Sequence, residues 1–122
     1  MWAKPTKKDL LKLEKNREEQ LKDKNGDTII LAHFFMGSND WYIVDYNPKT
    51  EAMFGYCVLN GNLQNAEWGT IFYQQDKNNP MTKKNNLMDL KLSFVEVDFD
   101  KHFKPTSFKK IYRELEKKIW GV

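Results

Sequence analysis

The sequence contains almost no cysteine. Cys57 is the single cysteine among 122 residues. One thiol cannot form an intramolecular disulfide, and zinc sites built on thiolates need several cysteines. We therefore expect packing alone to stabilise the fold. Cys57 should lie in the core, because free cysteine is among the most buried residue types.

Long apolar runs are also absent. No stretch approaches the roughly 18 to 20 apolar residues that a membrane-spanning helix needs. Residues 1–13 carry lysine and aspartate where a signal peptide places its apolar segment. We therefore expect a cytoplasmic protein that makes no contact with a membrane.

The chain lacks the motifs that mark most catalytic and nucleotide-binding sites. It has neither a GxxxxGK[ST] loop nor a GxGxxG sequence, so nucleotide phosphates have no ready cradle. His33 and His102 are accompanied by no serine or cysteine in a recognisable nucleophile motif. We therefore expect no enzyme activity, no cofactor and no metal ion.

One alternative concerns three carboxylates at alternate positions, Glu96, Asp98 and Asp100. They project to one side of a predicted strand, where they could hold a hard cation such as Mg²⁺. A solvated strand face is the other interpretation. We favour the solvated face, because the further ligands and the lysine of a nuclease site are missing.

Aromatic residues, by contrast, are abundant. The 8 Phe, 5 Tyr and 4 Trp make up 14% of the chain, and hydrophobic residues make up 40%. This composition is hard to reconcile with disorder. A chain of 122 residues can close one hydrophobic core but is too short for two, so we expect a single domain over residues 1–122.

The order of helical and strand-like segments predicts an α+β fold. We expect a helix over residues 7–22, capped by Thr6 with Asp9 three residues on. Gly55 and Gly69 lie inside strand patterns, where glycine commonly marks a bulge or the close approach of a ring. Short connections favour antiparallel neighbours in a meander. The expected strands are 28–36, 41–46, 52–59, 67–73 and 90–100, with an exposed loop over 74–88.

A second helix after Pro105 is the clearest element of the chain, and Thr106 or Ser107 should cap it. Its apolar residues follow the helical period at Phe108, Ile111, Tyr112, Leu115 and Ile119. We therefore predict a curved antiparallel sheet of about five strands with this C-terminal helix packed on one face. The N-terminal helix should lie near an edge or end of the sheet.

Four motifs in the centre of the chain resemble a known family. They stand in the order His33-Phe34-Phe35, Asp40-Trp41-Tyr42-Ile43-Val44-Asp45, Phe54-Gly55-Tyr56 and Ala66-Glu67-Trp68-Gly69. This order and spacing is similar to that of a family of small bacterial proteins catalogued as a domain of unknown function and carried on plasmids, conjugative elements and phages. The resemblance covers roughly Leu10 to Pro105. It implies mobile-element biology and no established reaction.

The central rings offer one candidate contact surface. Strand alternation puts Trp41 on one face of its strand and Tyr42 with Tyr46 on the other, so a sheet covered on one side would expose some rings. Exposed Tyr and Trp are frequent anchors of protein interfaces. The predicted partner-binding residues are Trp41, Tyr42, Tyr46, Tyr56 and Trp68. Coverage of both faces, which would make these rings core residues, is the open alternative.

The last helix offers a second candidate surface. Residues 101–122 hold seven basic and two acidic residues, whereas residues 25–100 hold five and ten. The candidates for phosphate binding are Lys109, Lys110, Arg113 and Lys117, with Lys118 beside them. A solvated helix face is the common alternative for such charges.

These features predict a binding protein. We expect the chain to be a non-enzymatic product of a mobile element or phage that inhibits a host nucleic-acid-targeting defence protein, as anti-CRISPR and anti-restriction proteins do. Its partner would be that protein or its nucleoprotein complex. The alternative is a nucleic-acid-binding accessory module that uses the basic helix for phosphates and the sheet rings for stacking.

Overall fold

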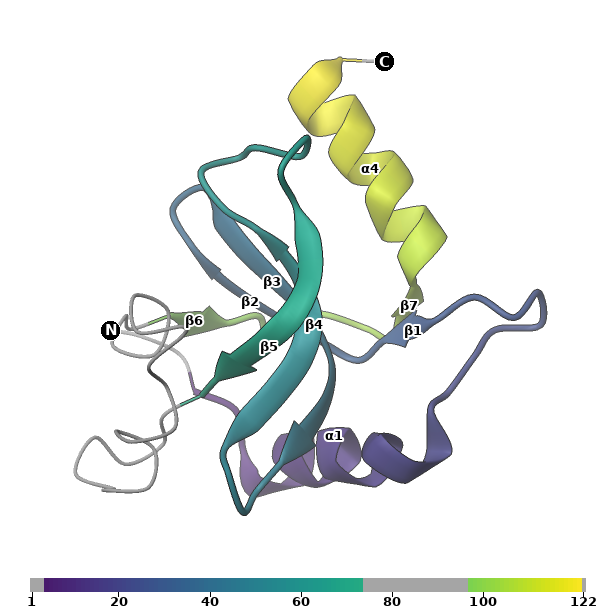
Figure 1. The fold of residues 1–122 in the computed structure, drawn as a ribbon, viewed down its shortest axis with the longest axis vertical. Helices are drawn as coiled ribbons and strands as arrows, with labels where there is room; N and C mark the ends of the chain where they lie inside the picture. Colours follow the sequence, from purple (N-terminus) through teal and green to yellow (C-terminus); the bar gives the residue numbers. More distant parts are fainter. Residues whose placement is uncertain (1–3, 74–96, 122) are drawn as a thin grey trace.

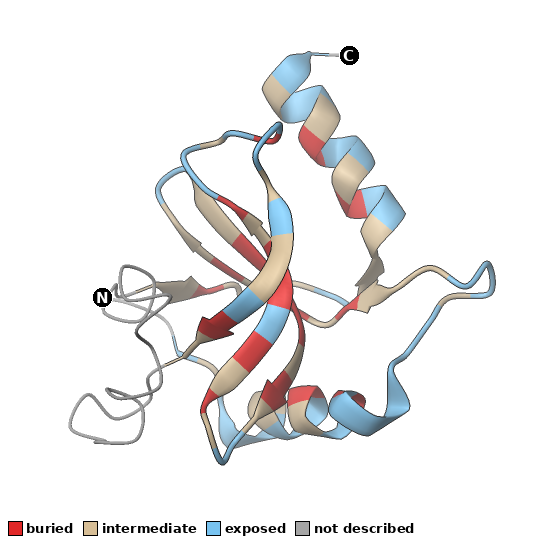
Figure 2. Cartoon of the chain, in the orientation of Figure 1, coloured by how far each residue is buried: buried red, intermediate tan, exposed pale blue. Residues whose placement is uncertain are grey.

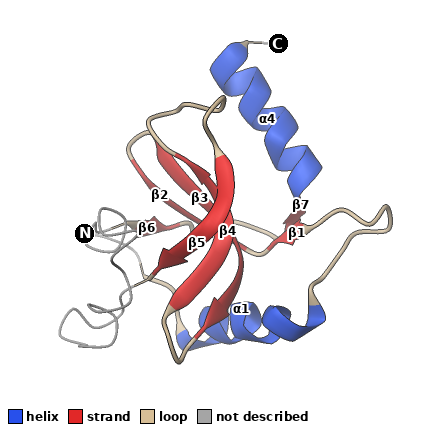
Figure 3. Ribbon diagram, viewed as in Figure 1, coloured by secondary structure: helices blue, strands red, loops and turns tan. Residues whose placement is uncertain are grey.

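The structure, a computed structural model, describes residues 4–73 and 97–121 and confirms the α+β class. Five strands form an antiparallel sheet in the order β5-β4-β3-β2-β6, and β1 pairs with β7 beside it (Figure 1). Within the described residues, two helices accompany the sheet (Figure 3). The elements are α1 (Lys7–Glu19), β1 (Ile29–Ile30), β2 (Ala32–Met36), β3 (Asn39–Asn47), β4 (Ala52–Val58), β5 (Glu67–Phe72), β6 (Asp98–Phe99), β7 (Thr106–Ser107) and α4 (Phe108–Trp120). Neither helix is long and apolar enough to cross a membrane within the described residues.

The two helices cover opposite faces of the sheet. Leu13 of α1 lies in a buried cluster with Phe34, Trp41, Ile43, Tyr46 and Met53. Ile111 and Leu115 of α4 lie in a second cluster with Ile30, Tyr42, Val44, Tyr56 and Val58. From Trp41 to Val44, successive residues of β3 alternate between the clusters, as the pleat of a strand requires. The register shift between Ile43 and Asp45 then puts Tyr46 in the cluster of Trp41, so the expectation that Tyr46 shares a face with Tyr42 is wrong. Helix α1 turns its buried residues toward the sheet and contacts the central strand β3, so the edge is wrong as one of its two expected positions, edge or end (Figure 2).

Helix α1 begins as predicted and ends earlier. Thr6 and Asp9 form a capping box, in which each side chain accepts a hydrogen bond from the other residue's backbone N–H. The expected end at residue 22 is wrong, because Gln20 adopts a left-handed conformation with φ 48°. The buried Asn16 side chain holds this end, since its Nδ2 donates to the Val44 carbonyl at 2.9 Å and its Oδ1 accepts from the Leu21 N–H at 2.8 Å.

Helix α4 buries the side of the helix that was predicted, but neither of the predicted residues provides its N-terminal capping hydrogen bond. Ser107 stands at the N-cap position, but its side chain makes no capping hydrogen bond, and the Thr106 hydroxyl donates to the Lys104 carbonyl instead. The Asp27 carboxylate accepts the Lys109 N–H at 2.7 Å. A residue distant in sequence therefore satisfies a backbone donor of the first turn.

The strand glycines differ from one another. A Cβ on Gly55 would collide with the backbone of β3 at Tyr42 and Ile43, beside the register shift between Ile43 and Asp45. The irregularity expected at Gly55 therefore lies in the neighbouring strand β3, and backbone instead of a ring approaches this glycine. Gly69 has no heavy atom within 4 Å of a Cβ position, so no close approach requires it.

Several expectations need adjustment. The strand expected over 28–36 is interrupted at residue 31 and forms β1 and β2. Cys57 is half-buried against the α1-side cluster and does not lie fully in the core. Of the strand expected over 90–100, the described part shows only Asp98–Phe99 as β6. The loop expected over 74–88 and the residue Glu96 lie outside the described residues.

Candidate functional site

Four of the five predicted partner-binding rings are core residues. The exposed fraction is 2% for Trp41, 8% for Tyr42, 1% for Tyr46 and 6% for Tyr56. Because the two helices cover both faces, the alternative of doubly covered rings holds for these four, and the expectation that they are exposed is wrong. Trp68 alone of the five is half-buried. A partner approaching the folded chain would meet only this one of the predicted rings.

A ring that the sequence left unassigned stands beside Trp68. Phe54 is 40% exposed, and its ring stacks on Trp68 with centroids 5.7 Å apart and planes inclined by 10°. Phe54 and Tyr56 are two residues apart on β4 and share a face, and Trp68 is the register partner of Tyr56 on β5. We call Phe54 and Trp68 the ring pair. It lies on the α4 side of the sheet, at the β4–β5 edge.

The ring pair continues into α4. Trp68 contacts Phe108, the first residue of α4, with centroids 4.7 Å apart, and Tyr56 with centroids 5.4 Å apart. Phe108 in turn contacts Tyr112 one helical turn on, with centroids 5.8 Å apart. A continuous row of rings therefore leads from the sheet edge to the beginning of the basic helix.

The predicted basic residues of α4 are all exposed. Lys109, Arg113 and Lys117 follow one another at intervals of four and form a line on the helix surface. Lys110 and Lys118 are exposed as well. The line lies opposite the buried stripe of the helix, and Trp120, 47% exposed, lies on the same outer face. The structure thus presents the ring pair, Trp120 and five cations on one side of the sheet.

Beneath one flank of α4 lies a hollow with a cavity volume of about 290 Å³. Tyr42 forms part of its wall, and burial, followed by the negative charges of Asp40, Glu114 and Asp100, raises the pKa of this phenol well above its usual range. The phenol is therefore neutral at physiological pH. The lining residues are His33, Tyr42, Phe103, Thr106, Lys110, Ile111, Glu114, Leu115 and Lys118.

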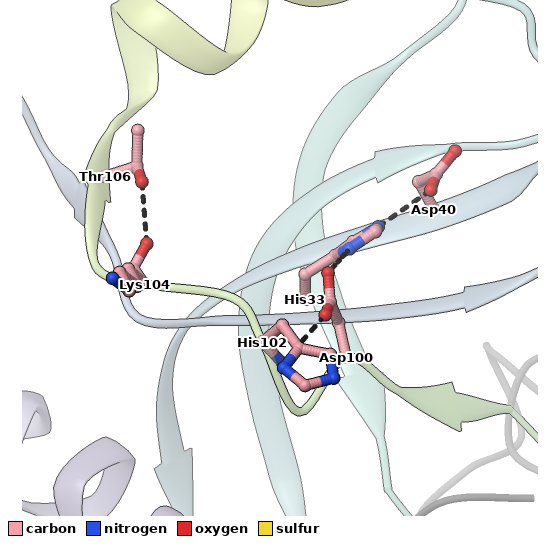
Figure 4. Close-up of polar contacts among 6 residues, drawn as sticks. All are labelled: His33, Asp40, Asp100, His102, Lys104 and Thr106. Atoms are coloured by element: carbon pink, nitrogen blue, oxygen red, sulfur yellow. Dashed lines mark hydrogen bonds and ion pairs between the residues drawn. The ribbon is translucent and has the colours of Figure 1, made fainter.

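His33 is the centre of a polar cluster at this hollow. Its Nε2 lies 2.7 Å from Asp40 Oδ1, and its Nδ1 lies 3.1 Å from Asp100 Oδ2 (Figure 4). The second oxygen of Asp100 accepts the backbone N–H of His102 at 3.1 Å. The imidazole stacks on Tyr42 with centroids 4.6 Å apart and planes inclined by 6°. The side chain therefore joins β2, β3 and the segment after β6.

This cluster has the geometry of a structural tie. Both ring nitrogens of His33 face carboxylates. A histidine that takes a proton from a catalytic nucleophile needs one ring nitrogen to face that nucleophile. In the described part of the chain, no serine, threonine or cysteine is hydrogen-bonded to this ring. The cluster holds the segment that leads into α4 against the sheet.

Of the three acidic residues considered for a metal ion, the structure describes Asp98 and Asp100. Asp100 is bound to His33, and Asp98 lies in β6, opposite Phe35 of β2. Within residues 4–73 and 97–121, no group of three or more histidine, cysteine, aspartate or glutamate residues is arranged to hold a metal. Because Glu96 lies outside these ranges, the three-carboxylate set is not described as a whole.

The geometry therefore singles out the exposed face of α4 and the ring pair. The sequence predicted the first through helical periodicity and missed Phe54 in the second, because alternation assigns a face without showing how far a helix covers it. The resemblance to the mobile-element family stays a prediction. Neither a protein-family model nor a curated protein nor a solved structure matches this chain.

Proposed function

We propose that this chain is a non-enzymatic, cytoplasmic protein that binds nucleic acid through the exposed face of α4. The observation that carries the proposal is the line of Lys109, Arg113 and Lys117, flanked by Lys110 and Lys118 and exposed along its length. Clustered Lys and Arg on one helix face neutralise phosphates and release counterions.

The spacing of the charges supports a role outside helix stability. Lys109, Arg113 and Lys117 are like charges at intervals of four, an arrangement that destabilises a helix by roughly 0.2–0.5 kcal/mol per pair. None of the five α4 cations forms a salt bridge with another described residue. A face serving only solubility could alternate signs, as Lys110, Glu114 and Lys118 do on the flank.

The second candidate function is protein contact. The ring pair supports it, because exposed aromatic residues are common anchors of protein interfaces. On this alternative the chain is the product of a mobile element or phage and inhibits a host defence protein, as anti-CRISPR and anti-restriction proteins do. The preference for nucleic acid follows from the burial of the four other rings that this surface was expected to use.

Fluorescence anisotropy tests the proposal. The probes are a labelled oligonucleotide of about 20 nucleotides and the matching duplex, longer than the ~4–16 nucleotides that one small domain covers. We expect binding that weakens steeply between about 50 and 200 mM salt. Absence of binding to both probes at about 50 mM salt, with specific capture of a host protein by the purified chain, would refute the proposal in favour of the second candidate.

A further inference from the structure

We infer that the ring pair Phe54–Trp68 stacks on unpaired bases, and that the nucleic acid bound by α4 is therefore single-stranded. The inference rests on the proposed function and specifies its ligand. It concerns Phe54 above all, a residue that neither the phosphate-binding line nor the core accounts for.

The ring pair is exposed and already ordered. Phe54 exposes 40% of its surface, although its neighbours Met53 and Tyr56 on β4 are buried at 1% and 6%. Trp68 holds it in a parallel stack and is itself supported by Phe108 and Tyr56 at ring centroid distances of 4.7 and 5.4 Å. A base stacking on Phe54 would extend an existing stack, so little side-chain entropy would be lost on binding.

The ring pair and the cations belong to the same surface. Trp68 contacts Phe108, and Lys109 is the next residue of α4. One turn further, Tyr112 contacts Phe108, and Arg113 follows Tyr112. In the first two turns of α4, therefore, a ring turned toward the sheet is followed by a cation on the outer face. A strand with a base on the ring pair would run its phosphates toward Lys109 and Arg113.

The chemistry favours single strands over duplexes. Bases in a duplex are stacked on one another, whereas proteins that bind single strands combine a positive track with aromatic side chains on which bases stack. The adjoining positive charge also favours nucleic acid over a protein partner at this surface. Lysine is depleted at protein interfaces relative to the rest of the surface, and Lys109 forms no salt bridge with another described residue.

The test substitutes the exposed ring and leaves the helix unchanged. Phe54→Leu keeps an apolar side chain and removes the π face, and Phe54→Trp retains a ring. Leu11→Ala on α1, at a residue 60% exposed, is the matched control for loss of exposed apolar surface on the opposite face. Anisotropy is measured with the single-stranded and duplex probes of about 20 nucleotides, and thermal melting verifies that each variant is folded.

The expected result is preferential binding of the single strand. Stacking contributes about 1–3 kcal/mol per base, so Phe54→Leu should weaken single-strand binding about 5- to 140-fold at 1.4 kcal/mol per tenfold. The variant should keep the wild-type salt slope, because no phosphate contact is removed. Phe54→Trp should restore the affinity, and Leu11→Ala should bind as the wild type does.

Three results would overturn the inference, and they are distinguishable from failure of the proposed function. Equal affinity for the single strand and the duplex, or unchanged single-strand binding by Phe54→Leu, would reject the ring pair as a stacking site while leaving nucleic-acid binding by α4 in place. Binding of neither probe at about 50 mM salt would reject the proposed function itself. Capture of a protein whose binding Phe54→Leu abolishes would assign the ring pair to a protein interface.

Discussion

Replacing Lys109, Arg113 and Lys117 together by glutamine removes the line of like charges from α4 and leaves Lys110 and Lys118 in place. All three side chains are exposed and none forms a salt bridge with another described residue. The substitution also removes two like-charge pairs at intervals of four. We therefore expect the variant to fold and to melt at the wild-type temperature or slightly above it.

The magnitude follows from the number of cations available to phosphates. If all five α4 cations contact phosphates, single-strand affinity scales with salt to a power of about −3.5, at −0.7 per contact. Raising salt fourfold, from about 50 to about 200 mM, then weakens wild-type binding about 130-fold. With two cations left, the power becomes about −1.4 and the same change weakens binding only about 7-fold.

The assay is fluorescence anisotropy with the single-stranded probe at several salt concentrations, and the slope is the quantity compared. The matched control replaces Lys8, Lys12 and Lys15 of α1 by glutamine, which makes the same change in net charge on the other face of the sheet. The control should keep the wild-type slope. An α4 variant with an unreduced slope, or a control that lowers the slope equally, would refute the reasoning.

Three parts of the fold and one titrating group give further tests. Gly55→Ala should destabilise the protein by about 1–3 kcal/mol in urea unfolding because its Cβ meets the β3 backbone, whereas Gly69→Ala should have little effect; equal losses would contradict the account of the bulge. Asp27→Ala should cost about 1 kcal/mol through the lost bond to the Lys109 N–H, and Ser107→Ala, which removes no capping bond, should be neutral by the same measurement. His33→Ala leaves the Asp40 and Asp100 carboxylates without the imidazole and should cost about 2–3 kcal/mol, against less than about 0.5 kcal/mol for the exposed His102→Ala. Burial raises the pKa of Asp45 above its ordinary value of 3.8, so the stability linked to its protonated form is present below pH 3.8 and is lost as pH rises through the raised pKa. The variant Asp45→Asn should therefore melt at a higher temperature than the wild type at neutral pH and at the same temperature below pH 3.8. A difference in melting temperature that does not change with pH would contradict this.

The local sequence was enough to predict those elements whose interactions join residues close together in the sequence. The capping box joins Thr6 and Asp9, three residues apart, and its geometry needs nothing beyond the first turn of α1. In α4, the helical period alone separates the buried Ile111 and Leu115 from the exposed cations. The basic half of the candidate site could therefore be predicted, because helical geometry places residues around an axis without reference to the rest of the chain.

The tertiary structure decided every feature that depends on residues distant in sequence. Asp27 caps α4 across 82 positions, and His33 binds Asp100 across 67. The position of α1 depends on Leu13 and on the bond from Asn16 to Val44, which lies 28 positions away in the sequence. Because α1 covers its face of the sheet, Trp41 and Tyr46 are core residues and not contact residues.

The ring pair shows the same division within one strand. Alternation along β4 places Phe54 and Tyr56 on the same face, and this much follows from the sequence once the strand is known. Tyr56 is buried because Phe108 and Tyr112 of α4 pack on it, whereas Phe54, two residues along, stacks on Trp68 and stays 40% exposed. Periodicity determines the face of a side chain only while strand pairing is regular, and the register shift in β3 moves Tyr46 to the face of Trp41. Only the docking of another element determines whether a position is covered.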